Sequence, residues 1–245
     1  MTVISMVQNM VSDWKAYSPV GTEQEVRFIC DVLNLKPNSQ ILDLYCGYGR
    51  HAIELAKCGY QVTGLDVNKD FLDIAKQKAI EAGVDVDFRQ SDMRDMQYNQ
   101  RFDAIINMFV AFGYFSDIEN SEVIKKIAQA LKIGGCFLID LLNRDWMIRN
   151  NLNRYWRHPS GEYVLAYKIE LQQGIAIMRR ELLNQITGTK TRAEFVLRAY
   201  SLTEMNNILE ENGFSIVHSY GGFDGCEYTK DTPRMIILAK KTQTC

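Results

Sequence analysis

The residues best placed to bind a ligand lie in the segment ILDLYCGYGRHA, at positions 41–52. There an apolar run leads into Gly47-x-Gly49, and a helical pattern begins directly afterwards. Glycines at such a turn let the backbone approach a ligand closely, and the first turn of a helix offers free N–H groups to a polar or anionic group. Asp66 ends the next apolar run, where a carboxylate can accept both hydroxyls of a ribose. The spacing therefore predicts a nucleoside-binding site.

Asp43 distinguishes between two kinds of nucleoside ligand. Gly47-x-Gly49-x-x-Ala52 also satisfies the pattern of sites that bind nicotinamide or flavin dinucleotides. However, Asp43 lies four residues before Gly47, and a carboxylate so close would repel a pyrophosphate and attract a cationic ligand end. S-adenosylmethionine has such an end, because it carries an ammonium beside a sulfonium. The pattern favours this ligand, and the remaining alternative is that the glycines form only a tight turn between a strand and a helix.

Apolar runs and helical patterns alternate along residues 38–158, a stretch without proline. Strands are predicted at 40–44, 60–65, 84–88, 102–109 and 136–142, with helices at 49–58, 69–82 and 119–131 between them. Gly134-Gly135 is expected to end the last of these helices. The alternation predicts βαβ units and a parallel sheet that is covered by helices on both faces.

The segments on either side complete the predicted architecture. Thr22-x-x-Glu25 and Ser201-x-x-Glu204 are expected to be capping boxes that open two further helices. From about residue 155 the pattern becomes that of an antiparallel meander, and after residue 200 it returns to a helix and two strands. The predicted fold is a doubly wound, Rossmann-like α/β domain with a seven-stranded sheet and an antiparallel β insertion after the fifth strand.

Three structural units are expected within this fold. Residues 1–36 would form N-terminal helices that act as a lid, residues 37–150 and 201–245 the cofactor-binding domain, and residues 155–200 the insert. Because the insert follows the fifth strand, it would lie at the carboxyl edge of the sheet, over the ligand crevice. It would form either a wall of the substrate pocket or a dimer surface, so a monomer and a homodimer are both compatible with the sequence.

The chain resembles the class I S-adenosylmethionine-dependent methyltransferases along nearly its whole length. ILDLYCGYGRHA is similar to the first motif of that family, VTGLDVN to the second, SDM at 91–93 to the third, and FDAIINMFVAFGYF to the motif of the fourth strand. The resemblance extends to a bacterial small-molecule branch with a β insert, similar to the sugar-amine N-methyltransferases. It is carried there by NRDW at 143–146, LRAY at 197–200 and the segment 221–241. One departure is Tyr45, where the family has a glycine that can relieve a left-handed φ.

The resemblance implies an adenosine site at the second and third motifs. Asp66 would bind the ribose, Asp92 the adenine amino group, and Met93 would pack on the adenine ring. Asp92 could instead cap the short turn that follows it. The cofactor-binding residues predicted in all are Tyr17, Asp43, Cys46, Gly47, Gly49, Asp66, Val67, Asp92, Met93 and Asn107.

Three of these residues are expected around the methionyl end of the cofactor. Asp43 and Asn107 would contact that end directly, and the resemblance implies that Tyr17 reaches its carboxylate from the lid. Each has a structural alternative: a helix cap for Asp43, a satisfied core amide for Asn107, and packing of the N-terminal segment for Tyr17.

The predicted acceptor site lies beside the aromatic segment 109–115, because open α/β sheets bind ligands at the carboxyl ends of their strands. The predicted substrate-binding residues are Tyr114, Trp156, Arg198, Tyr200 and Phe223. Core or rim packing is an equal alternative for Trp156, for Phe223 and for the segment 109–115. Residues 140–200 contain ten Lys and Arg against six Asp and Glu, so an anionic acceptor would suit this part of the chain. No side chain stands out as a general base.

Composition narrows the function classes. Lys and Arg total 28 against 30 Asp and Glu, which gives a net charge of −2 and no support for nucleic-acid binding. No apolar run reaches the ~18 residues of a membrane span. The six cysteines include no C-x-x-C pair, which predicts reduced thiols in a cytoplasmic protein without a metal site.

The expected reaction is methyl transfer to an N or O atom of a small molecule. The alternatives are an RNA or protein methyltransferase on the same fold and a non-catalytic cofactor-binding module.

Overall fold

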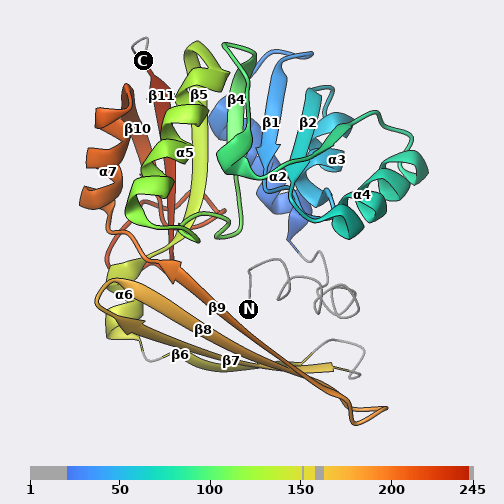
Figure 1. The fold of residues 1–245 in the computed structure, drawn as a ribbon, viewed down its shortest axis with the longest axis vertical. Coiled ribbons are helices and arrows are strands. Elements are labelled where there is room, and N and C mark those ends of the chain that lie inside the picture. Colours follow the sequence, from blue (N-terminus) through green and yellow to red (C-terminus); the bar gives the residue numbers. More distant parts are fainter. Residues whose placement is uncertain (1–20, 151, 158–162, 243–245) are drawn as a thin grey trace.

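The computed structural model describes residues 21–150, 152–157 and 163–242, and in these a seven-stranded sheet lies beside a four-stranded antiparallel sheet (Figure 1). The order of strands in the large sheet is β10-β11-β5-β4-β1-β2-β3. Their bounds are β1 (Gln40–Leu44), β2 (Gln61–Asp66), β3 (Asp87–Gln90), β4 (Phe102–Asn107), β5 (Leu131–Leu142), β10 (Phe214–Tyr220) and β11 (Arg234–Lys241). Strands β1 to β5 are parallel, and β11 runs antiparallel to both of its neighbours.

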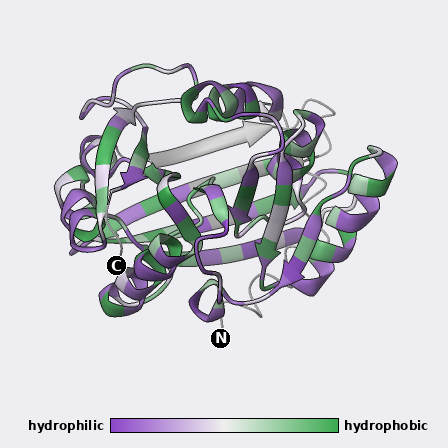
Figure 2. Cartoon of the chain, turned by 90° about the horizontal axis from the view of Figure 1, so that it is seen from above, coloured by the Kyte–Doolittle hydropathy of each residue, from purple (hydrophilic) through white to green (hydrophobic). Residues whose placement is uncertain are grey.

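Helices cover both faces of this sheet, as the apolar strands predict. The helices are α2 (Thr22–Leu33), α3 (Arg50–Lys57), α4 (Lys69–Glu81), α5 (Asp117–Ala130) and α7 (Leu202–Glu211). The first three share one buried core with the sheet, and α5 and α7 share the other. Figure 2 shows these helices banded in hydrophobic and hydrophilic colours, as expected of amphipathic helices between a core and solvent. The predicted α/β fold class is confirmed.

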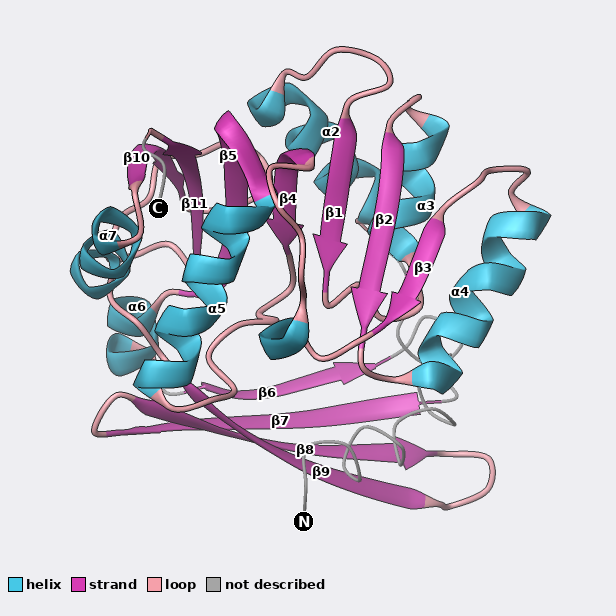
Figure 3. Cartoon of the chain, turned by 45° about the horizontal axis from the view of Figure 1, so that its top comes forward, coloured by secondary structure: helices cyan, strands magenta, loops and turns pink. Residues whose placement is uncertain are grey.

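The second sheet is formed by β6 (Leu152–Arg157), β7 (Tyr163–Gln172), β8 (Ile175–Asn184) and β9 (Lys190–Arg198), in that order. It follows β5 and the short helix α6 (Arg144–Arg149), so the antiparallel insertion after the fifth strand is confirmed. Figures 1 and 3 show it running across the carboxyl ends of the parallel strands. The predicted lid function of residues 1–36 stays a prediction, because residues 1–20 lie outside the described residues.

The insert presents two different faces. Directly paired residues of neighbouring strands share a face, so Ala176 lies beside Leu197 and Met178 beside Phe195. This apolar face forms a small core with Met147 of α6 and half-buried Tyr114 of the main domain. The opposite face carries a ladder of ion pairs. They join Lys168 and Arg179 to Glu170, Arg179 to Glu194, and Lys190 and Arg192 to Glu181.

Two predicted capping signals are wrong, although both helices end within one residue of the predicted positions. Gly134-Gly135 does not end α5: the helix stops at Ala130, and β5 begins at once and runs through both glycines. The register between β4 and β5 shifts near them, so these glycines accommodate an irregularity in a strand. The capping box at Thr22 is also absent, because the N-cap is Gly21 and makes no side-chain hydrogen bond. The predicted capping box at Ser201 and Glu204 is present.

Candidate functional site

The turn between β1 and α3 adopts a left-handed backbone at three positions. The φ angles of Tyr45, Gly47 and Gly49 are 69°, 55° and 76°. A Cβ on Gly49 would lie 2.8 Å from the ring of Phe88, whereas one on Gly47 would meet nothing within 4 Å. Gly49 therefore lets α3 pack closely on the sheet, and Gly47 leaves open space beside the N-terminus of α3. That space is what a ligand bound at this turn requires.

Tyr45, at the position where the resemblance has a glycine, adopts a left-handed φ. A left-handed φ costs a non-glycine residue about 1–2 kcal/mol. The peptide N–H groups of Tyr45 and Cys46 both donate to the carbonyl of Leu65, at 2.7 and 3.0 Å, and the ring of Tyr45 stacks on Tyr114 at 5.9 Å. These contacts offset the strain, and the stacking holds Tyr114 beside the turn.

Asp66 joins two loops at the end of β2. Its Oδ2 accepts a hydrogen bond from the N–H of Gly47 and its Oδ1 from the N–H of Asn68, both at 2.8 Å. The residue is buried, and burial raises the pKa of its carboxyl group. Asp66 thus lies beside Gly47, as a ribose-binding acid must, although its binding of ribose stays a prediction.

Three buried polar atoms near the end of β1 have no hydrogen-bond partner among the described residues: Asp43 Oδ2, Arg50 Nη2 and Asn107 Oδ1. Asn107 follows Ile106, the register partner of Asp43, and its Nδ2 donates to the carbonyl of Leu44 at 3.0 Å. Asp43 also faces the guanidinium of Arg50. Unpartnered buried polar atoms are rare and ask for an explanation. Two acceptors and one cationic donor in one place match the ammonium and carboxylate of an amino-acid group.

The carboxyl group of Asp43 has an unusually high pKa for an aspartate. Burial raises its pKa to about 7, against the opposing effects of Arg50 and of a hydrogen bond from the Ala52 N–H; nearby Asp66 raises it further. A carboxyl group with a pKa near neutrality gains most from a cationic ligand, because the ligand replaces the lost solvation of the charged form.

Arg50 is oriented by a cluster that the sequence did not predict. Its Nη1 donates to Thr22 Oγ1 at 3.1 Å and to the carboxylate of Glu25, and His51 Nε2 lies 2.8 Å from the same carboxylate. Burial alone would raise the pKa of Glu25, but the bonds from His51 and Arg50 hold it below its usual value. Thr22 and Glu25 bind Arg50 instead of capping α2. One signal was present in the sequence: an arginine in the first turn of a helix opposes the helix dipole.

The third predicted acid, Asp92, caps a short turn. It precedes η2 (Met93–Asp95), accepts a hydrogen bond from the N–H of Arg94 at 2.9 Å, and pairs with the Arg94 guanidinium at 2.8 Å. These bonds lower its pKa. The capping alternative is therefore observed. The adenine contacts of Asp92, buried Met93 and Val67 stay predictions.

The predicted substrate residues are not all brought together. Tyr114 stacks on Tyr45 at the end of the sheet. Trp156 lies in β6, where its backbone pairs in register with Leu165 of β7. Tyr17 lies outside the described residues.

Arg198 and Tyr200 face the junction of the insert with the main domain. Arg198 lies one position beyond the inward-facing Leu197, and it donates to the carbonyls of Gly174 and Ala199 and to Glu204. The hydroxyl of Tyr200 donates to Asp117 and accepts from Asn120, both at 3.0 Å. Their contacts are those of residues that hold the insert on the main domain, and their binding of a substrate stays a prediction.

We expect Arg198→Ala to lower the free energy of unfolding by about 1–3 kcal/mol, because it removes charged hydrogen bonds from a half-buried junction. Thermal or urea denaturation measures this. Arg192→Ala is the matched control, since Arg192 is exposed on the same strand and its ion pair within the described residues is with half-buried Glu181. Equal losses for the two variants would contradict the role given to Arg198.

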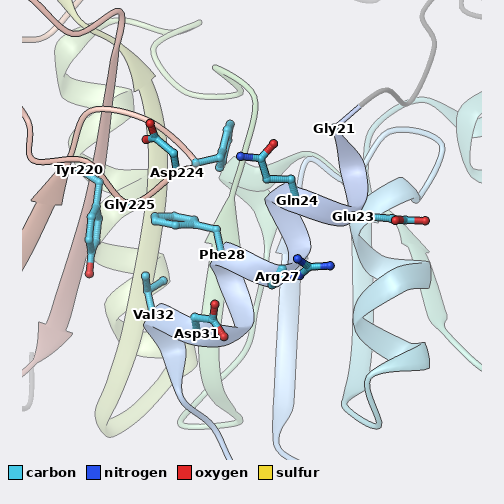
Figure 4. Close-up of a pocket in the computed structure, with 11 residues that line it drawn as sticks. Gly21, Glu23, Gln24, Arg27, Phe28, Asp31, Val32, Tyr220, Asp224 and Gly225 are labelled. Atoms are coloured by element: carbon cyan, nitrogen blue, oxygen red, sulfur yellow. The ribbon is translucent and has the colours of Figure 1, made fainter.

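Phe223, the last of the predicted substrate residues, lines a pocket along α2. A pocket of about 690 Å³ lies along α2, and Phe28 of α2 forms edge contacts there with Phe223 and Tyr220, at 5.7 and 5.0 Å between ring centres (Figure 4). Arg234 lies over the Phe223 ring, 4.9 Å from its centre. Phe223 is therefore near the carboxyl edge of the sheet but faces α2.

No helix in the described part of the chain is long and apolar enough to span a membrane.

Comparison with known proteins agrees with the fold and the turn. Residues 41–135 match the family described as the methyltransferase domain. The glycine/sarcosine N-methyltransferase of Aphanothece halophytica is 25% identical over 235 residues, which cover 94% of this chain and 84% of that protein.

Solved structures of low sequence identity share the fold. An S-adenosylmethionine-dependent methyltransferase from Clostridium acetobutylicum ATCC 824 has a TM-score of 0.79 at 20% identity, over 90% of this chain and 92% of that one. The amino pentose methyltransferase CalS10 from Micromonospora echinaspora has a TM-score of 0.75 at 17% identity, over 94% and 95%. Residues 41–135 thus match the methyltransferase domain, the chain has the fold of class I S-adenosylmethionine-dependent methyltransferases, and these similarities together support a methyltransferase that uses S-adenosylmethionine.

Proposed function

We propose that this methyltransferase acts on a nitrogen or oxygen atom of a small molecule, bound between the carboxyl ends of the parallel strands and the β insert. The observation that carries the proposal is the group of unpartnered atoms on Asp43, Arg50 and Asn107. It supports a fixed position for the methionyl end of the cofactor at the end of β1.

The remaining cofactor contacts follow from that position. The oxygens of Asp43 and Asn107 would accept from the ammonium, and Arg50 would bind the carboxylate. Asp66 would bind the ribose beside Gly47, with Asp92 and Met93 at the adenine. When bound, S-adenosylmethionine supplies an electrophilic methyl group on its sulfonium. The protein contributes alignment, which is a large part of the rate enhancement in displacement reactions.

The acceptor would lie against the apolar face of the insert. Met178, Leu182 and Phe195 are on that face. Contact of Trp156 with the acceptor stays a prediction. Of the ten basic residues of segment 140–200, Lys168, Arg179, Lys190 and Arg192 pair with glutamates. These four therefore give no support to an anionic acceptor. The similar proteins that methylate glycine, sarcosine or an amino pentose favour an amine, which needs only to arrive uncharged to act as nucleophile.

The direct experiment is to incubate the protein with methyl-labelled S-adenosylmethionine and a whole-cell extract, which contains metabolites, RNA and protein, then separate the products by size. We expect label in low-mass compounds. Label that appears only in RNA or protein would refute a small-molecule acceptor, and a catalytically silent protein that binds cofactor would support a binding module.

Asp66→Ala should weaken the binding of S-adenosylhomocysteine by about 1.5–3 kcal/mol, the range for hydrogen bonds to a charged group. The variant should also lose some stability, because the N–H groups of Gly47 and Asn68 lose their acceptor. Calorimetry measures the affinity and thermal denaturation the stability. Asp85→Ala, at an exposed acid before β3, is the control. Full affinity in folded Asp66→Ala protein would refute the ribose contact.

A further inference from the structure

The chain leaves β4 through two consecutive residues in the left-handed region. The φ angles of Phe109 and Val110 are 64° and 63°. Non-glycine residues seldom adopt this conformation, and a β-branched residue such as Val110 does so least of all. Such a backbone persists only where its surroundings hold it, and it occurs most often at ligand-binding sites.

Asp140 of β5 holds both peptide groups of this turn. Its Oδ2 accepts a hydrogen bond from the N–H of Phe109 at 2.8 Å, and its backbone carbonyl accepts one from the N–H of Val110 at 3.0 Å. Arg234 of β11 fixes the carboxylate in turn: its Nε donates to Oδ1 at 2.8 Å, and its Nη2 donates to Oδ2. Asp140 is fully buried, so water cannot replace these bonds.

The turn is connected directly to the proposed cofactor site. Asn107, whose Oδ1 has no partner among the described residues, lies two residues before Phe109. Phe109 is 52% exposed, and the centre of its ring lies 4.7 Å from the guanidinium carbon of Arg50. A change in the turn would therefore displace the amide of Asn107 and the ring against which Arg50 packs.

We propose that Asp140, held by Arg234, is a positioning residue for methyl transfer: it keeps the Phe109–Val110 turn left-handed, so that Asn107 and Arg50 present their free polar atoms to the cofactor. The inference rests on the proposed cofactor site and does not depend on the acceptor. Neither Asp140 nor Arg234 was among the predicted site residues.

Glycine at position 110 provides the test, because glycine adopts a left-handed φ without help. Asp140→Ala should weaken the affinity for S-adenosylhomocysteine about tenfold, or about 1.4 kcal/mol. In the Val110→Gly background the same change should cost less than about threefold, or about 0.7 kcal/mol. Gln173→Gly also relieves a left-handed residue, at a φ of 49° in the turn between β7 and β8, and should give no such rescue.

The melting temperature is recorded beside each affinity, because a purely structural role would lower it without a rescue of binding by Val110→Gly. Where Asp140→Ala does not fold, Arg234→Gln replaces it in the same comparison, with the same rescue expected. Equal losses in both backgrounds, or full affinity in folded Asp140→Ala protein, would overturn the inference alone. Failure of the wild-type protein to bind S-adenosylhomocysteine would overturn the proposed cofactor site itself.

Discussion

Binding of S-adenosylhomocysteine to this protein should weaken as the pH falls below about 7, approaching tenfold per pH unit. Burial holds the pKa of Asp43 at about 7 in the absence of ligand, and the ligand ammonium needs the ionised form. Below that pKa the carboxyl group must lose a proton before it pairs, and each pH unit then costs about 1.36 kcal/mol. Calorimetry between pH 5.5 and 8.5 measures the slope.

Asp43→Asn separates this effect from other titrations near the site. The variant keeps the shape of the side chain, removes the titrating group, and should bind about 10–150-fold more weakly at pH 8, by loss of a charged hydrogen bond. Its affinity should vary less with pH than that of the wild type. His51 is a second titrating group close by, and burial lowers its pKa. The same slope in both proteins would assign the pH dependence to His51 and not to Asp43.

The same group gives a stability effect of opposite direction. Because the pKa of Asp43 is higher in the folded than in the unfolded chain, its contribution to stability is present at low pH and is lost as the pH rises through about 7. Without ligand, Asp43→Asn should therefore gain stability relative to the wild type at pH 8. Thermal denaturation at pH 5.5 and 8 measures the difference.

Gly49→Ala should lower the free energy of unfolding by about 2–5 kcal/mol. The left-handed φ of 76° costs an alanine about 1–2 kcal/mol, and its Cβ would lie 2.8 Å from Phe88 and 3.0 Å from Ala75, which adds about 1–3 kcal/mol of overpacking. Urea denaturation checks the value.

Gly59→Ala is the matched control. Its φ is 87°, but nothing lies within 4 Å of a Cβ there, so only the backbone cost of about 1–2 kcal/mol applies. The difference between the two variants isolates the contact with Phe88. Equal losses would show that packing of α3 on the sheet does not depend on Gly49.

The main sheet could be predicted because its signals are local. Most strands are short apolar runs, and the residue types at Gly47 and Gly49 indicate the turn. The polar strand β3 is the exception: the predicted strand at 84–88 overlaps the observed Asp87–Gln90 at two residues only. Asp43, Asp66 and Asn107 were placed correctly near one another, since the carboxyl ends of neighbouring parallel strands meet at one edge. Their individual ligand contacts stay predictions.

The clusters that orient these groups could not be predicted, because they join segments far apart in the chain. The spacing of Thr22 and Glu25 fits a capping box equally well until Arg50 is brought beside them. Asp140 likewise appears in the sequence as one polar residue in an apolar strand, and Arg234 binds it from 94 residues away. The face of Arg198 was uncertain for another reason: a shift of one residue in a strand reverses the side on which every side chain lies.

The position of β11 has a consequence for how the protein folds. In the sheet it lies between β5 and β10, yet it follows both in the chain, and its Arg234 pairs with Leu142. During synthesis, β10 therefore leaves the ribosome before β11, the strand that connects it to the sheet. Until β11 is made, β5 has an unpaired apolar edge. Such edges are prone to pair with other chains. A nascent chain stalled before residue 234 should aggregate, whereas release of the last strand would close the sheet in a single late step.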